Sequence, residues 1–124
     1  MPVYRNRYIN LFTLPVGGYM PTAAVNDISW SDPIGGPAML VGIEARLKVA
    51  SASALTLRVT AKSDADATLW QESITVSASD KREPVLFAAP RTLVQGDYLT
   101  LDKTDANNTS DGRDLDLKVL GRWT

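Results

Sequence analysis

Apolar and polar residues alternate with a period of two through most of the chain after residue 39. In the stretch LVGIEARLKVA, glycine and charged residues occupy every second position from Gly42 to Lys48. The residues that fall on the other face are Val41, Ile43, Ala45, Leu47 and Val49. This pattern predicts a strand with one side in a core and one side in water. Residues 55–62, LTLRVTAK, repeat it, and the short polar stretch 50–53 between the two predicts an antiparallel hairpin.

Further strands follow the hairpin, each bounded by turn residues. In residues 69–76 the alternation is disturbed near Glu72 and Ser73, which predicts a bulge because one extra residue reverses the faces. The apolar stretch 85–89 lies between two prolines, which suits an edge or a strand terminus because proline donates no hydrogen bond to a ladder. The last strands are residues 98–102 and 115–123, and the position of Trp123 in the alternation predicts a place in the core or in an interface.

The first 38 residues follow a different pattern. Residues 4–14 have strand-forming composition but alternate poorly, and glycine and proline are frequent from Pro15 to Pro37. Only residues 23–30 are expected to add a short strand there. The segment is nevertheless rich in apolar and aromatic residues, which are costly to leave in water. Two interpretations follow: the segment packs as an arm on a neighbouring subunit, or it covers the open end of its own sandwich.

These strands predict an all-β fold, a single β-sandwich or jelly roll of about eight antiparallel strands with an extended N-terminal arm. Residues 1–38 are assigned to the arm and the Pro/Gly-rich segment, and residues 39–124 to the sandwich body. No stretch is predicted to be helical. A chain of 124 residues is long enough for one such domain with a core of its own.

Composition narrows the chemistry that the chain can perform. It contains no cysteine and no histidine, which excludes disulfides, thiolate nucleophiles, serine–histidine triads and histidine-ligated metals. The net charge of -1 is too close to zero to indicate nucleic acid as the main partner. We find no signal-peptide pattern and no apolar run of about 20 residues, so we expect synthesis in the cytoplasm and no membrane association.

Acidic and amide side chains cluster in the stretch DANNTSDGRD, residues 105–114. A calcium-binding EF-hand loop needs oxygen ligands at set positions and a glycine at the sixth. Counted from Asp105, the sixth residue is Ser110, and the glycine comes two residues later. Asn, Asp, Ser and Gly are also the residues that a hairpin connection needs. The stretch therefore favours a turn over a cation site, and we expect no cofactor.

Exposed aromatic residues are the other candidates for ligand binding. Trp30 lies in the Pro/Gly-rich segment and is the best candidate for an exposed platform on which a sugar ring stacks, although packing is the commoner role of tryptophan. Glycosidase chemistry needs two carboxylates across a cleft. Glu44, Glu72 and Glu83 are available, but nothing in the pattern pairs them. We therefore expect no enzymatic activity.

Residues 39–124 resemble a pattern typical of small jelly-roll structural proteins of tailed bacteriophages. The segments that carry the resemblance are VGIEARLKV, LTLRVTAKSDADATLW, ITVSASDKREP, VQGDYLTLD and LDLKVLGRW. They match in strand spacing and turn placement and include no diagnostic motif. The resemblance implies a virion component, either a head decoration (cement) protein that clamps capsid subunits or a module of a fibre, spike or adaptor, commonly as a homotrimer. It implies no catalytic residues.

The sequence thus leads to the hypothesis of a decoration protein on the outer surface of the phage head, with the major capsid protein and further copies of itself as partners. The residues expected at the subunit or capsid interface are Tyr4, Arg5, Arg7, Tyr8, Ile9, Leu11, Phe12, Tyr19 and Met20. A protein present in many copies can hold a lattice through modest contacts, because effective concentration favours each further attachment. The alternative is a carbohydrate- or receptor-binding or adaptor module of a tail, fibre or spike, with Trp30 as its stacking residue.

Overall fold

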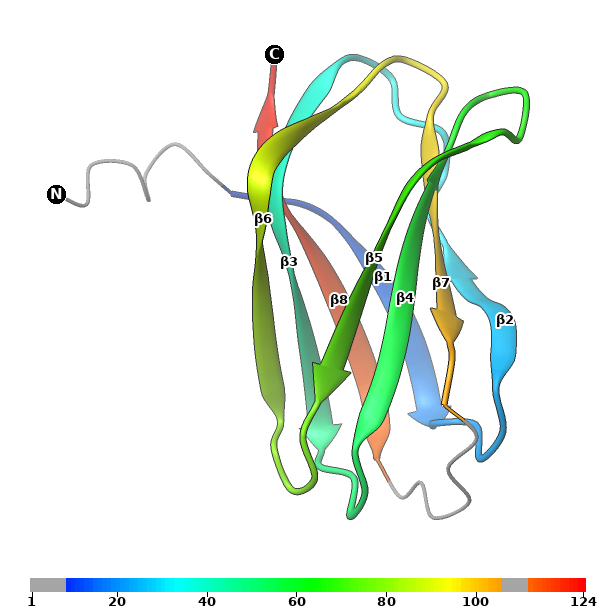
Figure 1. Ribbon diagram of the computed structural model, residues 1–124, viewed down its shortest axis with the longest axis vertical. Coiled ribbons are helices and arrows are strands. Elements are labelled where there is room, and N and C mark those ends of the chain that lie inside the picture. Colours follow the sequence, from blue (N-terminus) through cyan, green and yellow to red (C-terminus); the bar gives the residue numbers. More distant parts are fainter. Residues whose placement is uncertain (1–8, 106–111) are drawn as a thin grey trace, which may run out of the picture.

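The computed structural model describes residues 9–105 and 112–124 and shows an antiparallel β-sandwich (Figure 1). Within these ranges the chain forms eight strands. They are β1 (Ile9–Tyr19), β2 (Val25–Trp30), β3 (Ala38–Val49), β4 (Leu55–Lys62), β5 (Thr68–Val76), β6 (Arg82–Leu93), β7 (Tyr98–Lys103) and β8 (Arg113–Trp123). The described residues include no helix with the length and apolar character needed to span a membrane.

The strands are divided between two four-stranded sheets. One sheet has the order β1-β8-β3-β6 and the other the order β2-β7-β4-β5. Every neighbouring pair is antiparallel. The chain passes from one sheet to the other at every connection except the one between β4 and β5, which is the jelly-roll arrangement. The predicted fold class, an all-β jelly roll of eight antiparallel strands, is confirmed.

The core is the apolar layer between the two sheets. Alternate side chains of each strand point into it, as the period-two pattern predicted. On β4 these include Leu57 and Val59, and on β8 Leu117 and Val119, all with 0% of their surface exposed. Full burial of such a side chain is worth about 1.5–3 kcal/mol, so this shared layer is the main force that holds the sheets together.

The predicted hairpin between residues 41–49 and 55–62 is wrong. β3 pairs with β6 and β8, whereas β4 pairs with β5 and β7 in the opposite sheet. The alternation identified the buried face of each strand correctly, but it carries no information on the strand with which each one pairs. The short connection between them therefore crosses from one sheet to the other.

A bulge in β3 shifts the buried positions by one residue. The register changes between Leu40 and Gly42 in both ladders of this strand. Leu40 and Ile43 are both fully buried on either side of the bulge, while Val41, which was predicted on the buried face, is only partly buried. One extra residue in a strand reverses the faces locally, which explains the difference.

The bulge predicted near Glu72 and Ser73 is also wrong. β5 pairs with β4 without interruption from Val76 to Trp70, and its register shift lies before Trp70. Glu72 interrupts the apolar pattern because it is a charged residue that is only partly exposed. Its carboxylate accepts a hydrogen bond from the guanidinium of Arg91 at 2.8 Å. β6, which contains the two prolines, lies at the edge of its sheet as predicted.

The described part of the N-terminal segment belongs to the sandwich. β1 pairs with β8 from Ile9 to Tyr19, and β2, the short strand expected within residues 23–30, pairs with β7. Leu14 and Met20 are 0% and 2% exposed and lie in this chain's own core. Residues 9–20 are therefore not a separate arm on a neighbour. They pack on their own sandwich, as the second interpretation had it, but β1 does so as an edge strand of one sheet and not as a cover over an open end. Residues 4–8 lie outside the described residues.

We predict that Gly121→Ala destabilises the fold. A Cβ at this position would collide with the carbonyl oxygen of Met39 and lie 3.0 Å from the Cα of Leu40, both backbone atoms next to the β3 bulge. Forcing a methyl group into such a site typically costs about 1–3 kcal/mol, measurable by urea denaturation. Gly17→Ala is the matched control, because no atom lies within 4 Å of a Cβ there. Equal losses in the two variants would contradict the assigned close approach.

Candidate functional site

Two hollows lie at the end of the sandwich where β8 ends, which is the top of Figure 1. A hollow of about 410 Å³ is lined there by residues of β1, by the connection from β2 to β3 and by Trp123. Trp123 also borders a second hollow of about 360 Å³ with Gly35, Gly36 and Pro37. Trp123 is 49% exposed, which excludes a place in the core. We call Leu11, Phe12, Pro33, Pro37 and Trp123 the Trp123 surface.

Hydrogen bonds hold the connection that forms one wall of this surface. The amide of Ser31 donates to the carbonyl of Leu99, whose own amide donates to the Ser31 hydroxyl, each at 2.9 Å. The amide of Ile34 donates to the carbonyl of Asp97 at 2.9 Å, and the Ile34 side chain is buried. Residues 31–37 are thus hydrogen-bonded to β7 and to the turn before it, although they form no strand.

The structure separates the nine residues expected at an interface. Leu11 and Phe12 are partly buried and line the hollow beside Trp123. Ile9 and Tyr19 are exposed at opposite ends of β1. Met20 is buried and cannot contact a partner in this fold, which corrects its assignment to the interface. The remaining four, Tyr4, Arg5, Arg7 and Tyr8, lie outside the described residues. Trp123, which the alternation placed in the core or in an interface, is half-exposed and lies beside Leu11 and Phe12.

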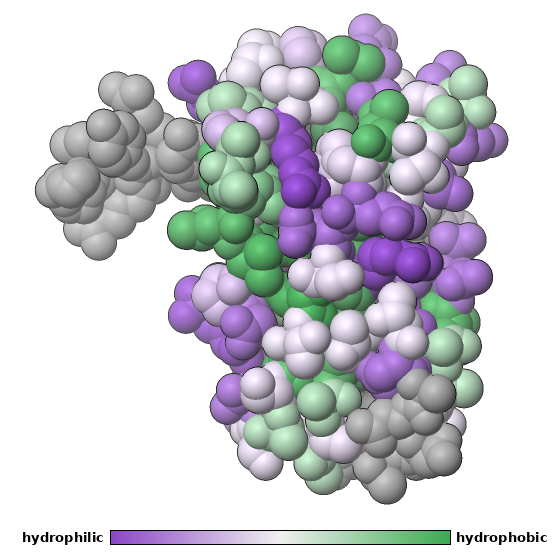
Figure 2. Space-filling model, in the orientation of Figure 1, coloured by the Kyte–Doolittle hydropathy of each residue, from purple (hydrophilic) through white to green (hydrophobic). Residues whose placement is uncertain are grey.

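A polar groove crosses the outer face of the β2-β7-β4-β5 sheet. Its deeper part, of about 190 Å³, is lined by Asn26, Asp27, Arg58, Thr60, Lys62, Thr68, Gln71, Thr100 and Asp102. It adjoins a hollow of about 260 Å³ bordered by Trp30 and Tyr98, and the two parts share Asp27, Lys62 and Thr100. We call the two parts together the Trp30 groove. Figure 2 looks onto this face and shows hydrophilic residues across its upper middle.

Short side chains and a distorted edge strand produce the groove. Thr60 and Thr100 are opposite each other on β4 and β7 and form its floor, with only 3% and 5% of their surfaces exposed. On β2 the register shifts between Val25 and Ser29, and Asp27 within that interval has a φ of 55°. This left-handed conformation is uncommon for residues other than glycine, and it places Asp27 in the wall of the groove.

Asp102 on β7 connects the two neighbouring strands β2 and β4 on one side of the groove. One of its carboxylate oxygens accepts the backbone amide of Asp27 at 2.8 Å, and the other accepts the guanidinium of Arg58 at 2.9 Å. On the far side, the amide nitrogen of Gln71 donates to the hydroxyl of Thr60 at 3.2 Å. Because Asp102 is almost fully buried and its two oxygens are bonded, the lining of the groove is ordered before any ligand arrives.

Two aromatic residues flank the shallower part of the groove. Trp30 is 64% exposed, as its place in the Pro/Gly-rich segment led us to expect. The hydroxyl of Tyr98 donates to the carboxylate of Asp66 at 2.6 Å, and this hydrogen bond raises the pKa of Tyr98 above its ordinary value. Tyr98 is therefore a neutral phenol at physiological pH. Trp30 also borders the hollow beside Trp123, so it lies between the two surfaces.

The third tryptophan has a packing role. Trp70 on β5 meets Phe87 on β6 edge to face, with 5.5 Å between ring centroids. The guanidinium of Arg91 lies 4.6 Å from the Trp70 ring and 4.5 Å from the Phe87 ring, and it pairs with Glu72. These contacts close the side of the sandwich between the edge strands β5 and β6.

The carboxylates considered for glycosidase chemistry are not paired with one another. Glu44 accepts the guanidinium of Arg82 at 2.9 Å, and this hydrogen bond lowers the pKa of Glu44. Glu72 is paired with Arg91 in the other sheet. A general acid needs a raised pKa near a second carboxylate, which is the opposite of the environment of Glu44.

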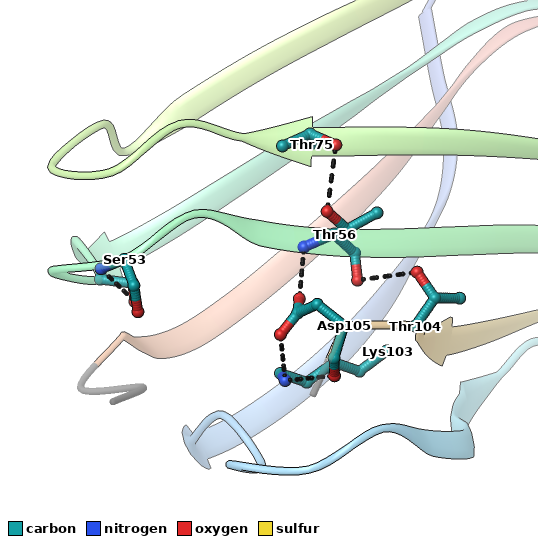
Figure 3. A network of polar contacts seen from close by, with 7 residues as sticks. Ser53, Thr56, Thr75, Lys103, Thr104 and Asp105 are labelled. Carbon is teal, nitrogen blue, oxygen red and sulfur yellow. Dashed lines mark hydrogen bonds and ion pairs between the residues drawn. The ribbon is translucent and has the colours of Figure 1, made fainter. Parts of the chain in front are cut away.

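Two carboxylates of the acidic stretch 105–114 accept hydrogen bonds from residues of other strands. Lys103 is fully buried, and its ammonium donates to a carboxylate oxygen of Asp105 at 2.6 Å and to the Asp105 carbonyl at 3.0 Å. The other carboxylate oxygen of Asp105 accepts the amide of Thr56 at 2.6 Å (Figure 3). Asp114 accepts the amide of Gly18 at 2.8 Å. Residues 106–111 lie outside the described residues. Among the residues that are described, no three carboxylates are placed to hold a metal ion.

Comparison with known proteins gives no family for this chain. No family model and no curated protein matches it. Among solved structures it is similar to an arabinose-bound α-L-arabinofuranosidase, at 13% identity and a TM-score of 0.48, over 87% of this chain and 18% of that one. It is similar to the globular domain of zebrafish complement 1qA, at 14% identity and a TM-score of 0.46, over 90% of this chain and 94% of that one.

A third similar structure is the VP2 protein of infectious bursal disease virus, at 9% identity and a TM-score of 0.43. The match covers 90% of this chain and 31% of VP2. The chain thus spans less than a third of the arabinofuranosidase and of VP2. At such low identity and similarity, none of these structures carries a conclusion about the function of this chain.

We predict that the two partners of the buried ion pair respond differently to substitution. Asp105→Asn leaves the ammonium of Lys103 buried without a carboxylate and should lower the free energy of unfolding by about 3–5 kcal/mol. Lys103→Met removes the buried charge and keeps an apolar stem of similar length, so it should cost about 1 kcal/mol or less. Urea denaturation at pH 7 measures both. A larger loss in Lys103→Met than in Asp105→Asn would contradict this assignment.

Proposed function

We propose that this chain is a non-enzymatic structural protein of a bacteriophage particle, a decoration protein that attaches to the major capsid protein through the Trp123 surface. The observation that carries the proposal is the half-exposed Trp123 beside Leu11 and Phe12, at a hollow with hydrogen-bonded walls. Contiguous exposed apolar surface marks interaction sites. Tryptophan is also among the residues that contribute most when an interface closes around them.

Two observations favour the capsid as the partner. Residues 39–124 resemble jelly-roll virion proteins in strand spacing and turn placement. In addition, Ile9 pairs with Gly121, two positions before Trp123, so the chain enters β1 beside this surface. The expected interface residues Tyr4, Arg5, Arg7 and Tyr8 directly precede that point in the sequence. They and the Trp123 surface would then contribute to one attachment site on the outer face of the head.

Association of the chain with itself belongs to the same proposal. A trimer presents three Trp123 surfaces at once, and attachment of the first raises the effective concentration of the others. Modest affinity at each surface is then sufficient to hold the protein on a lattice. The oligomeric state, which the resemblance implies to be trimeric, is measured directly by light scattering on the purified protein.

We predict that Trp123→Ala reduces the number of copies of this chain on purified particles by about tenfold or more, since loss of a central interface tryptophan commonly costs over 1.4 kcal/mol. Copies are counted by quantitative mass spectrometry of gradient-purified particles. Leu86→Ala is the matched control, because Leu86 lies on β6 and is, at 76%, the most exposed large apolar residue in the part of the chain that the structure describes. Thermal unfolding of both variants checks the fold. Undiminished occupancy with Trp123→Ala, or absence of the wild-type chain from particles, would reject the proposal.

We predict that deletion of residues 2–8 weakens attachment and leaves the stability of the sandwich unchanged. The deletion removes Tyr4, Arg5, Arg7 and Tyr8 and stops before β1, whose loss would expose the core at Leu14. Occupancy is counted as above, and stability by thermal unfolding. Full occupancy after this deletion would confine the attachment site to the sandwich.

A further inference from the structure

We propose that the Trp30 groove binds a neutral saccharide, through hydrogen bonds from its polar lining and packing of a sugar ring against Trp30. The groove lies on the outer face of the β2-β7-β4-β5 sheet, apart from Trp123. The inference therefore stands without the proposed attachment to the capsid, and it would hold equally for a tail or fibre module.

The charges of the groove favour a neutral ligand. Its lining contains two cationic residues, Arg58 and Lys62, and two anionic residues, Asp27 and Asp102, so the formal charges sum to zero. Arg58 and Asp102 already neutralise each other through their ion pair at 2.9 Å. An anionic or cationic ligand would find no excess of opposite charge, whereas a ligand with many hydroxyl groups meets donors and acceptors side by side.

Several polar groups of the lining are available to a ligand. Within the described residues, neither the carboxylate of Asp27 nor the ammonium of Lys62 forms a hydrogen bond or an ion pair. Each sugar hydroxyl both donates and accepts, so one hydroxyl can bridge an acceptor such as Asp27 and a donor such as Lys62.

Trp30 supplies the apolar contact that a sugar requires. The two faces of a pyranose ring carry C–H groups, and these pack favourably on the large flat surface of an indole. Trp30 is mostly exposed at the edge of the groove, and Tyr98 stands on the same hollow with its hydroxyl held by Asp66. Aromatic residues beside a few convergent polar groups are the usual composition of a small-molecule site.

The backbone of β2 gives independent support. Asp27 keeps a left-handed φ of 55°, and the hydrogen bond from its amide to Asp102 holds it there. Such conformations cost free energy and concentrate at binding sites. Here the strained residue is the one whose free carboxylate lines both parts of the groove.

The position of the groove argues against a peptide ligand. A peptide that binds as an added strand needs unpaired backbone groups at a sheet edge. The floor of the groove lies on β4 and β7, and each of these strands is paired on both sides. The floor of the groove therefore offers a ligand side chains and no free strand edge, which suits a saccharide.

The test is titration of the purified chain, monitored by isothermal calorimetry and tryptophan fluorescence. The probes are neutral hexasaccharides of glucose (α1,4- and β1,4-linked), mannose, galactose and xylose, with oligogalacturonate as the anionic comparator and a glycan array for wider coverage. We expect at least one neutral probe to bind, and oligogalacturonate to bind more weakly. Trp30→Ala and Gln71→Ala should each weaken that binding by about tenfold.

Two control variants separate this site from the rest of the molecule. Leu86→Ala, in the other sheet, and Trp123→Ala, outside the groove, should leave the affinity for the saccharide unchanged. Absence of binding across all neutral probes would overturn the inference, as would binding that survives Trp30→Ala and Gln71→Ala or a clear preference for oligogalacturonate. Trp30 borders both surfaces, whereas Gln71 lines only the groove. Because Trp123→Ala tests attachment and Gln71→Ala tests the groove, each proposal can fail without the other.

Discussion

The apolar layer between the two sheets is the interaction on which the rest of the molecule depends. Nearly every connection crosses from one sheet to the other, so no sheet can form from neighbouring segments alone, and both must close over the same layer. When every second side chain of a strand is buried in this layer, the side chains between them must point to the outer face of the sheet. The Trp30 groove consists of such outward positions, Thr60 and Lys62 on β4 with Thr100 on β7. The Trp123 surface arises where this layer ends.

Hydrogen bonds and an ion pair at the edges of the apolar layer determine the shape of the Trp30 groove and of the Trp123 surface. Asp102 is buried and joins Asp27 of the edge strand to Arg58 of β4, which orders the groove. Hydrogen bonds from Ser31 and Ile34 hold the Pro/Gly-rich connection over the hollow beside Trp123. A buried donor or acceptor without a partner costs more than an ordinary hydrogen bond contributes, so these segments have few alternative positions. Both surfaces are thus preformed, which lowers the entropy lost when a partner binds.

The sequence predicted the buried faces well because the period of two depends only on local residues. It assigned Ile43 and Leu47 to the core, and both are buried, and it singled out Trp30 as the best candidate for an exposed aromatic residue. It failed where the outcome depends on distant segments. The pairing of β3 with β8 rather than β4 is decided by strands far away in the chain, and the bulge at Leu40 and Gly42 is stabilised by contacts with β6 and β8. Met20 was assigned to an interface because it belongs to an apolar segment with frequent glycine and proline, in which the pattern did not reveal β1. This strand ends one residue before Met20, whose side chain is buried in the core. The groove itself could not be foreseen, since it requires four strands to be placed side by side.

We propose that the end of the sandwich around Trp123 faces another protein in a phage particle. A cryo-electron microscopy reconstruction of the particle that contains this chain tests it most directly. We expect sandwich-shaped density on the outer surface of the head, with Trp123, Leu11 and Phe12 covered by the major capsid protein. Density in which Trp123 points into solvent, or a particle in which this chain is absent, would contradict it.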